Sequence, residues 1–154
     1  MTNAGAKTLV MGFGNPGRLD DGLGPALAAR LEALAPAGVT VDSDYQLTVE
    51  DAAVVAAHDV AIFADAHVSC APPFVFEPVE PKAGGSFTSH SVSPAQVMGL
   101  AHGLFGARTR GYLLGIRGHE FNEFGERLSD GAAANLDAAL AFLLTWLREG
   151  ETHS

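Results

Sequence analysis

The sequence is poor in cysteine, and Cys70 is the single example among its 154 residues. One thiol excludes an internal disulfide and any metal site built from several cysteines. A reactive thiol needs a lowered pKa, and no histidine or basic residue is evidently paired with Cys70. We therefore expect Cys70 to be a small buried thiol.

Basic residues are also scarce, since nine Lys and Arg stand against eighteen Asp and Glu for a net charge of −9. This balance argues against a nucleic-acid partner and against an acidic membrane surface, because both are bound through Lys and Arg. Apolar runs long enough to span a bilayer are missing, and residues 1–7 lack the pattern of a signal peptide. We expect a cytoplasmic protein.

Apolar residues are plentiful at 47%, against 18% charged residues, which is typical of a folded chain with a real core. The pattern predicts one domain over residues 1–154, with an ordered core over 7–148 and a loose tail over 149–154. Strands and helices alternate along it, so we expect an α/β fold, a three-layer α/β/α sandwich around a mostly parallel twisted sheet of about five strands. The expected strands are 9–11, 39–42, 60–64, 74–78 (at an edge) and 112–116, and the expected helices are 22–35, 47–57, 94–104 and 130–147.

The most informative stretch is 9–24, LVMGFGNPGRLDDGLG. A short apolar strand ends in a glycine-rich turn, and two adjacent carboxylates, Asp20 and Asp21, follow just before a helix. Ligands of open parallel sheets bind at the carboxyl ends of the strands, where such turns lie. Two carboxylates with almost no basic residue nearby are poorly suited to binding phosphate and better suited to binding a metal ion.

Three residues occupy comparable positions in the expected sheet: Asp21 after the first strand, Asp65 at the end of the third, and His90 in the loop after the fourth. Neighbouring strand ends can bring both carboxylates to one cleft, and His90 can close over them. One imidazole and two carboxylates suit a divalent transition metal such as zinc or nickel. Each residue also has a simpler interpretation: Asp21 as a helix cap, Asp65 as an Asx turn, and His90 as a solvated histidine. The spacing of the other histidines, His58, His67, His102 and His119, singles none of them out.

Two other sites are disfavoured by the residues around them. Gly12, Gly14 and Gly17 match the spacing of a dinucleotide fingerprint, but Pro16 stiffens the turn and the two aspartates would repel a pyrophosphate. The serines of the 81–91 segment lack the Gly-x-Ser-x-Gly pattern of serine hydrolases.

The chain resembles the hydrogenase maturation endopeptidases, the small α/β proteases that trim the C-terminus of a [NiFe]-hydrogenase large subunit. The sharpest match is 12–15 (GFGN) followed by 20–24 (DDGLG), similar to the family's Gly-x-Gly-Asn and Asp-Asp-Gly-x-Gly. Asp65-Ala66 after a strand and His90 in Thr88-Ser89-His90 are the further matches. The segments 45–52 and 118–121 resemble the branch that serves cytoplasmic, NAD-coupled hydrogenases, whereas 70–73 lacks the glycine expected after the Asp-Ala motif.

The resemblance implies a phosphorylase/hydrolase-like fold and a protease without a permanently bound metal. It implies that Asp21, Asp65 and His90 grip nickel already inserted in the precursor, for which zinc or cadmium can substitute in crystals. The metal would polarise the scissile carbonyl or activate a water, and an aspartate such as Asp21 would act as the base. Asp20 is expected at the helix entry or behind the ligands. The implied partner is the large-subunit precursor, with no nucleic acid and no membrane.

Two rival functions remain open at this point. A nickel-sensing chaperone of the large subunit would share the metal residues and lack cleavage. Peptidyl-tRNA hydrolase shares the opening Gly-x-Gly-Asn-Pro-Gly, but its Thr-Arg-His-Asn stretch is replaced here by residues 18–21 (RLDD), and a sequence pI near 4.9 does not supply a basic face for RNA.

Overall fold

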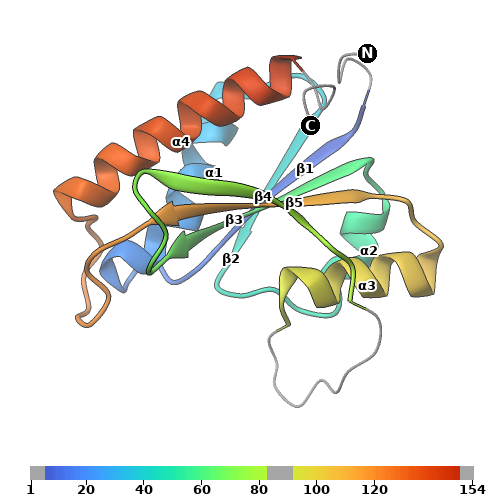
Figure 1. Ribbon diagram of the computed structural model, residues 1–154, viewed down its shortest axis with the longest axis horizontal. Coiled ribbons are helices and arrows are strands. Elements are labelled where there is room, and N and C mark those ends of the chain that lie inside the picture. Colours follow the sequence, from blue (N-terminus) through green and yellow to red (C-terminus); the bar gives the residue numbers. More distant parts are fainter. Residues whose placement is uncertain (1–5, 83–91, 150–154) are drawn as a thin grey trace.

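Five strands form one sheet in the computed structural model, which describes residues 6–82 and 92–149 (Figure 1). The spatial order is β2-β1-β3-β5-β4, with all neighbours parallel except β4, which runs antiparallel to β5. The expected α/β class and the mostly parallel sheet are confirmed. The strands are β1 (Thr8–Phe13), β2 (Val39–Asp44), β3 (Val60–His67), β4 (Phe74–Val79) and β5 (Arg110–Arg117).

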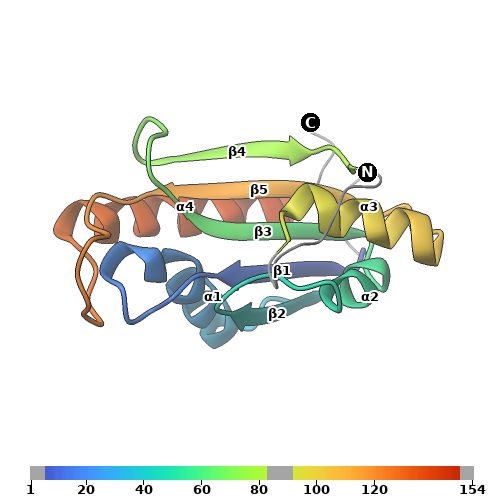
Figure 2. The ribbon, with the colours of Figure 1, turned by 90° about the horizontal axis from the view of Figure 1, so that it is seen from below.

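Helices cover both faces of the sheet (Figure 2). The longer pair, α1 (Leu23–Leu34) and α4 (Asp130–Glu149), packs on one face, and the shorter pair, α2 (Asp51–Ala56) and α3 (Pro94–Phe105), packs on the other. In Figure 2, α2 and α3 lie over the half of their face where the parallel strands begin. The turns that follow β1, β3 and β5 therefore lie at the opposite edge.

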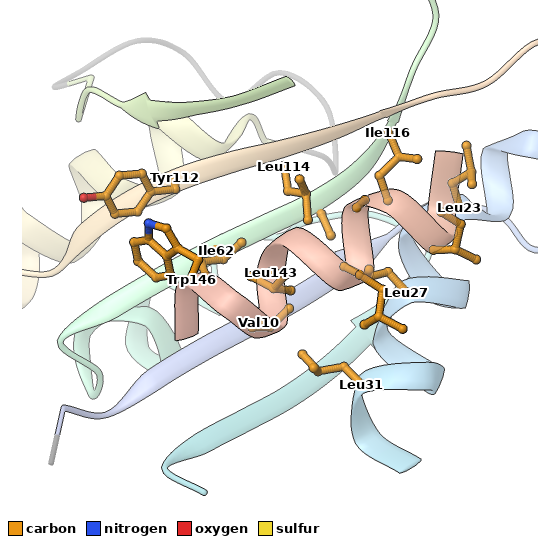
Figure 3. Close-up of a cluster of buried hydrophobic side chains, with 14 of the residues drawn as sticks. Val10, Leu23, Leu27, Leu31, Ile62, Tyr112, Leu114, Ile116, Leu143 and Trp146 are labelled. Atoms are coloured by element: carbon orange, nitrogen blue, oxygen red, sulfur yellow. The ribbon is translucent and has the colours of Figure 1, made fainter. Parts of the chain in front are cut away.

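Alternation along the strands divides the core between the two faces, because successive side chains point to opposite sides of a sheet. Val10, Ile62 and Leu114 face the leucines of α1 and the apolar stripe of α4 (Figure 3). An aromatic group extends this core along α4 toward its C-terminal end, where the rings of Tyr112 and Trp146 lie 5.2 Å apart between centroids. Residues on the opposite face, including Leu9, Met11 and Phe63, pack against α2 and α3.

Local signals place several element ends where the sequence predicts them. Ser93 caps α3, accepting a hydrogen bond from the Gln96 N–H while the Gln96 side chain accepts one from the Ser93 N–H, and Pro94 occupies the first turn. Strand β4 lies at a sheet edge, as its prolines indicate. Gly22 precedes α1, and Pro25 lies in the first turn of that helix.

Two predicted boundaries are wrong in ways that bear on the site. Helix α2 begins at Asp51 rather than at 47, because the carboxylate of Asp51 accepts a hydrogen bond from the Thr48 N–H and holds the preceding residues in a turn. Strand β3 continues to His67 instead of ending at Asp65, because β5 is long enough to pair with it through Arg117. Asp65 therefore lies inside the strand, opposite Gly115.

Candidate active site

The glycines of the first turn allow α1 to approach the sheet without intervening side chains. A Cβ atom on Gly24 would lie 2.4 Å from the Phe13 carbonyl oxygen and 2.6 Å from that of Ala64, and one on Gly12 would lie 2.2 Å from the Gly24 oxygen. No side chain fits at these distances. The glycines thus bring the start of α1 against β1 and β3, which is a packing role rather than that of a phosphate cradle.

Asp21 is held by this same turn in a short 3-10 helix, η1 (Leu19–Gly22). Its carboxylate accepts a 2.8 Å hydrogen bond from the Asn15 N–H, and the Asn15 side chain in turn accepts one from the Gly17 N–H. Gly14 adopts φ +142°, and a Cβ there would lie 2.1 Å from the backbone carbonyl oxygen of Asp21. Neither η1 nor α1 has a side-chain cap hydrogen bond, so the interpretation of Asp21 as a simple helix cap is wrong.

Asp65 lies near the carboxyl end of β3, and one of its carboxylate oxygens accepts a 2.8 Å hydrogen bond from the Ala66 N–H. An Asx turn would bond to the residue two positions on, so this alternative is also wrong. Burial, together with the neighbouring Asp21 carboxylate, raises the pKa of Asp65 to about 7 against the opposing effect of the Ala66 hydrogen bond. The structure thus brings Asp21 and Asp65 within electrostatic reach of each other, as the strand order predicts.

The third candidate, His90, lies outside the described residues, so its place beside the two aspartates stays a prediction. Within the described ranges, no group of three His, Cys, Asp or Glu side chains is arranged to hold a metal ion. The other histidines that the sequence left open have local structural contacts instead. His58 contacts the Val54 oxygen, His67 accepts from the N–H groups of Ser69 and Cys70, His102 contacts the Thr109 oxygen, and His119 packs beside Gly131 near Asn135.

Asp20 has a role that the sequence only outlines. Its side chain is fully buried and accepts hydrogen bonds from the N–H groups of His119 (2.7 Å), Glu120 (2.9 Å) and Ser129 (2.8 Å) and from the Ser129 hydroxyl (2.7 Å). Burial raises the pKa of this carboxyl, but the hydrogen bonds outweigh burial and leave the pKa below its ordinary value. Asp20 thus binds different groups from Asp21, and it fastens η1 to residues 119–120 and to Ser129, the residue before α4.

The turn after β3 is fastened to β5 in a comparable way. The Arg117 guanidinium donates to the Cys70 carbonyl at 2.7 Å and to the Gly118 carbonyl at 3.1 Å. Cys70 is half-buried, and burial raises the pKa of its thiol although Arg117 opposes the shift. The raised pKa agrees with the expected unreactive thiol, but Cys70 is half-buried rather than buried, and the basic residue Arg117 lies beside it.

Several solved structures that share this fold belong to one class of protein. No protein-family model matches the chain, and no curated protein matches it. Solved structures do match it. It is similar to the [NiFe] hydrogenase maturation protease HycI from Thermococcus kodakarensis KOD1, with a TM-score of 0.71 and 21% identity over 92% of each chain. It is also similar to the hydrogenase 2 maturation peptidase of Thaumarchaeota archaeon SCGC_AB-539-E09, with a TM-score of 0.67 and 23% identity over 92% of this chain and 97% of the other.

The hydrogenase maturating endopeptidase HybD from E. coli matches with a TM-score of 0.66 and 25% identity, over 92% of this chain and 91% of that one. Proteins of one named class, peptide hydrolases of hydrogenase maturation, therefore share this fold. The resemblance predicted from the 12–24 motif is confirmed by these structures. No described helix combines the length and apolar character that crossing a bilayer requires.

Proposed function

We propose that this protein is an endopeptidase that removes the C-terminal extension of a [NiFe]-hydrogenase large-subunit precursor after nickel insertion. The observation that carries the proposal is the pairing of Asp21 and Asp65 at the carboxyl ends of adjacent strands, in the fold of the maturation proteases. In this proposal the nickel belongs to the substrate. We also propose the cytoplasm as its location and the NAD-coupled branch as its hydrogenase type, both from the sequence.

The chemistry of the two carboxylates supports a cation at this place. Asp65 is costly to ionise because it is withdrawn from water and faces a second carboxylate. A divalent cation between them would remove that cost and favour the ionised form of both. Asp21 and Asp65 supply oxygen ligands, and His90 is the proposed nitrogen ligand; this set leaves coordination positions for the precursor's own groups.

In the proposed reaction, the two aspartates and His90 bind the metal that the precursor carries and so position the neighbouring peptide bond. Bound metal supplies Lewis acidity toward a carbonyl or a water. The protein's own contribution is a rigid placement of Asp21, through Asn15 and Gly14, and of Asp65, through the β3–β5 pairing. Such positioning can contribute several kcal/mol to lowering the barrier.

The test is incubation of the purified protein with the precursor, with and without inserted nickel, followed by intact-mass analysis. We expect loss of a C-terminal peptide only from the nickel-loaded precursor. Asp21→Asn and His90→Ala should remain folded and stop cleavage. Asp137→Asn, which changes an exposed carboxylate of α4 paired with Arg30 of α1, should cleave normally. Normal cleavage by a folded Asp21→Asn protein would refute the assignment. Binding of the loaded precursor without cleavage by the wild type would support the chaperone instead.

A further inference from the structure

The segment between β5 and α4, residues 118–129, is held against the turn that carries Asp21. The Leu19 N–H donates to the Gly125 oxygen at 2.9 Å, the Gly125 N–H donates to the Gly17 oxygen at 2.8 Å, and the Asp20 N–H donates to the Glu120 oxygen at 3.0 Å. The buried Asp20 carboxylate adds four further hydrogen bonds. This 118–129 loop therefore has a defined place relative to the candidate active site.

The loop presents an aromatic side chain to solvent despite this fixed backbone. The Phe124 side chain is 83% exposed. Among the described residues, its one aromatic or cationic neighbour is Arg18, whose guanidinium carbon lies 5.3 Å from the ring centroid. Burying a phenylalanine side chain is favourable, and this ring forgoes that stabilisation in the isolated protein. Tyr45 after β2 and Val68 after β3 are also exposed, at 68% and 67%, and lie at the same edge of the sheet.

A pocket lies beside the loop, on the side of α1. It has a volume of about 250 Å³ and is lined mainly by apolar side chains. Pro16, Leu19, Pro25 and Leu128 form much of this lining, and Ala29 lies on its α1 side. An apolar side chain from a partner fits the chemistry of such a lining.

The charge of the loop indicates the kind of partner. Glu120, Glu123 and Glu126 are exposed, and the one arginine of the loop, Arg127, lies 4.0 Å from Glu120, so the loop is acidic on balance. Among the described residues, Glu123 and Glu126 form no ion pair. The whole chain carries a net charge of −9, so a second copy would approach with the same sign of charge. A positively charged polypeptide that also carries an apolar side chain is the complementary partner.

We propose that the 118–129 loop and its pocket are the docking surface for the precursor protein. A basic segment of the precursor pairs with Glu123 and Glu126, an apolar residue contacts Phe124, and a second apolar residue enters the pocket beside Ala29. Docking at this surface places the precursor next to Asp21, because the loop is hydrogen-bonded to the same turn. The inference rests on the proposed function and names the surface through which it is exerted.

The experiment measures kcat and KM for cleavage of nickel-loaded precursor at low and high salt. Phe124→Ala and Ala29→Phe, which fills the pocket, should each raise KM about tenfold with kcat nearly unchanged. The double variant Glu123→Gln/Glu126→Gln should raise KM at low salt and lose this effect at high salt. Matched controls are Leu104→Ala, 72% exposed at the end of α3 on the opposite edge, and Glu80→Gln after β4, both expected within twofold of wild type.

Two readouts keep the inference distinct from the proposed function. If the wild type binds the precursor without cleaving it, the proposed protease fails, and the docking surface is judged by the same variants through Kd. Unchanged KM or Kd in the Phe124 and glutamate variants, with thermal unfolding like the wild type, would overturn the docking surface alone. Dimerisation in light scattering that Phe124→Ala abolishes would assign the surface to a second copy, and absence of both binding and cleavage would overturn both proposals.

Discussion

Replacing Asp65 by Asn should stabilise the protein at neutral and alkaline pH. The carboxyl has a pKa of about 7 in the folded state against 3.8 ordinarily, because burial and the Asp21 charge disfavour its ionised form. The folded state thus holds the proton more tightly than the unfolded state does. Wild-type stability therefore falls as pH rises between about 4 and 7, and it stays at the lower level above pH 7.

The size of the effect follows from the shift in pKa. A difference of roughly 3 pKa units corresponds to a ceiling of about 4 kcal/mol, at about 1.36 kcal/mol per unit. Asp65 is only partly buried, and solvent relaxation around a partly exposed carboxylate reduces this figure. We expect Asp65→Asn to gain about 1 to 3 kcal/mol at pH 8, and its amide oxygen can still accept from the Ala66 N–H.

The assay is urea unfolding of both proteins at pH 4.5 and pH 8 in the presence of a chelator. The difference between variant and wild type cancels the contributions of other titrating groups. That difference should be small at pH 4.5 and reach its full value at pH 8, and thermal unfolding at pH 8 should show a rise in Tm of about 3 to 10 °C. Asp137→Asn serves as the exposed control, with no comparable gain. An Asp65→Asn protein that gains no stability between the two pH values would refute the electrostatic argument.

Three further changes test the packing around the site. Asp20→Asn should lower the free energy of unfolding in urea by about 3 kcal/mol, because the amide NH₂ group would face hydrogen-bond donors. In the wild type, the stability that the ionised Asp20 supplies is present at neutral pH and is lost as the pH falls through its lowered pKa. Gly24→Ala should destabilise the protein by at least about 2 kcal/mol, because its Cβ would overlap backbone oxygens of β1 and β3. Gly103→Ala in α3 has open space around it and should stabilise the protein by up to about 1 kcal/mol. Calorimetry should therefore show a lower Tm for the first variant and not for the second, and a Tm that changes equally in both would contradict the packing argument. Ser93→Ala should cost about 1 kcal/mol through loss of the α3 cap, measured by thermal unfolding, and an unchanged Tm would show that Gln96 alone suffices.

The sheet and the pairing of Asp21 with Asp65 could be predicted because both depend on local patterns. Apolar runs, prolines and glycines mark the elements, and parallel pairing of the strands then brings the carboxyl ends of β1 and β3 together. The end of β3 could not be predicted. Its extension to His67 depends on pairing with β5, whose partner residues lie about fifty positions further along the chain.

The division of labour between Asp20 and Asp21 also exceeds what the sequence can show. Both are carboxylates at a helix entry, and their spacing only indicates that they point in different directions. Which one is buried depends on the N–H groups of His119, Glu120 and Ser129, which reach it from about 100 residues away. The sequence does suggest where such donors could come from, since residues 117–127 form a long polar segment before the last helix.

The hydrogen bonds of Asp20 have a consequence for the order in which the chain matures during synthesis. Asp20 and Ser129 are separated by 109 positions, and His119 by 99. Both aspartates of the candidate site and all five strands are therefore synthesised before the donors that fasten η1 exist. A nascent or truncated chain that ends before His119 contains none of the groups that donate to the Asp20 carboxylate. The turn that carries Asp20 and Asp21 is thus completed by a segment about 100 positions further along the chain.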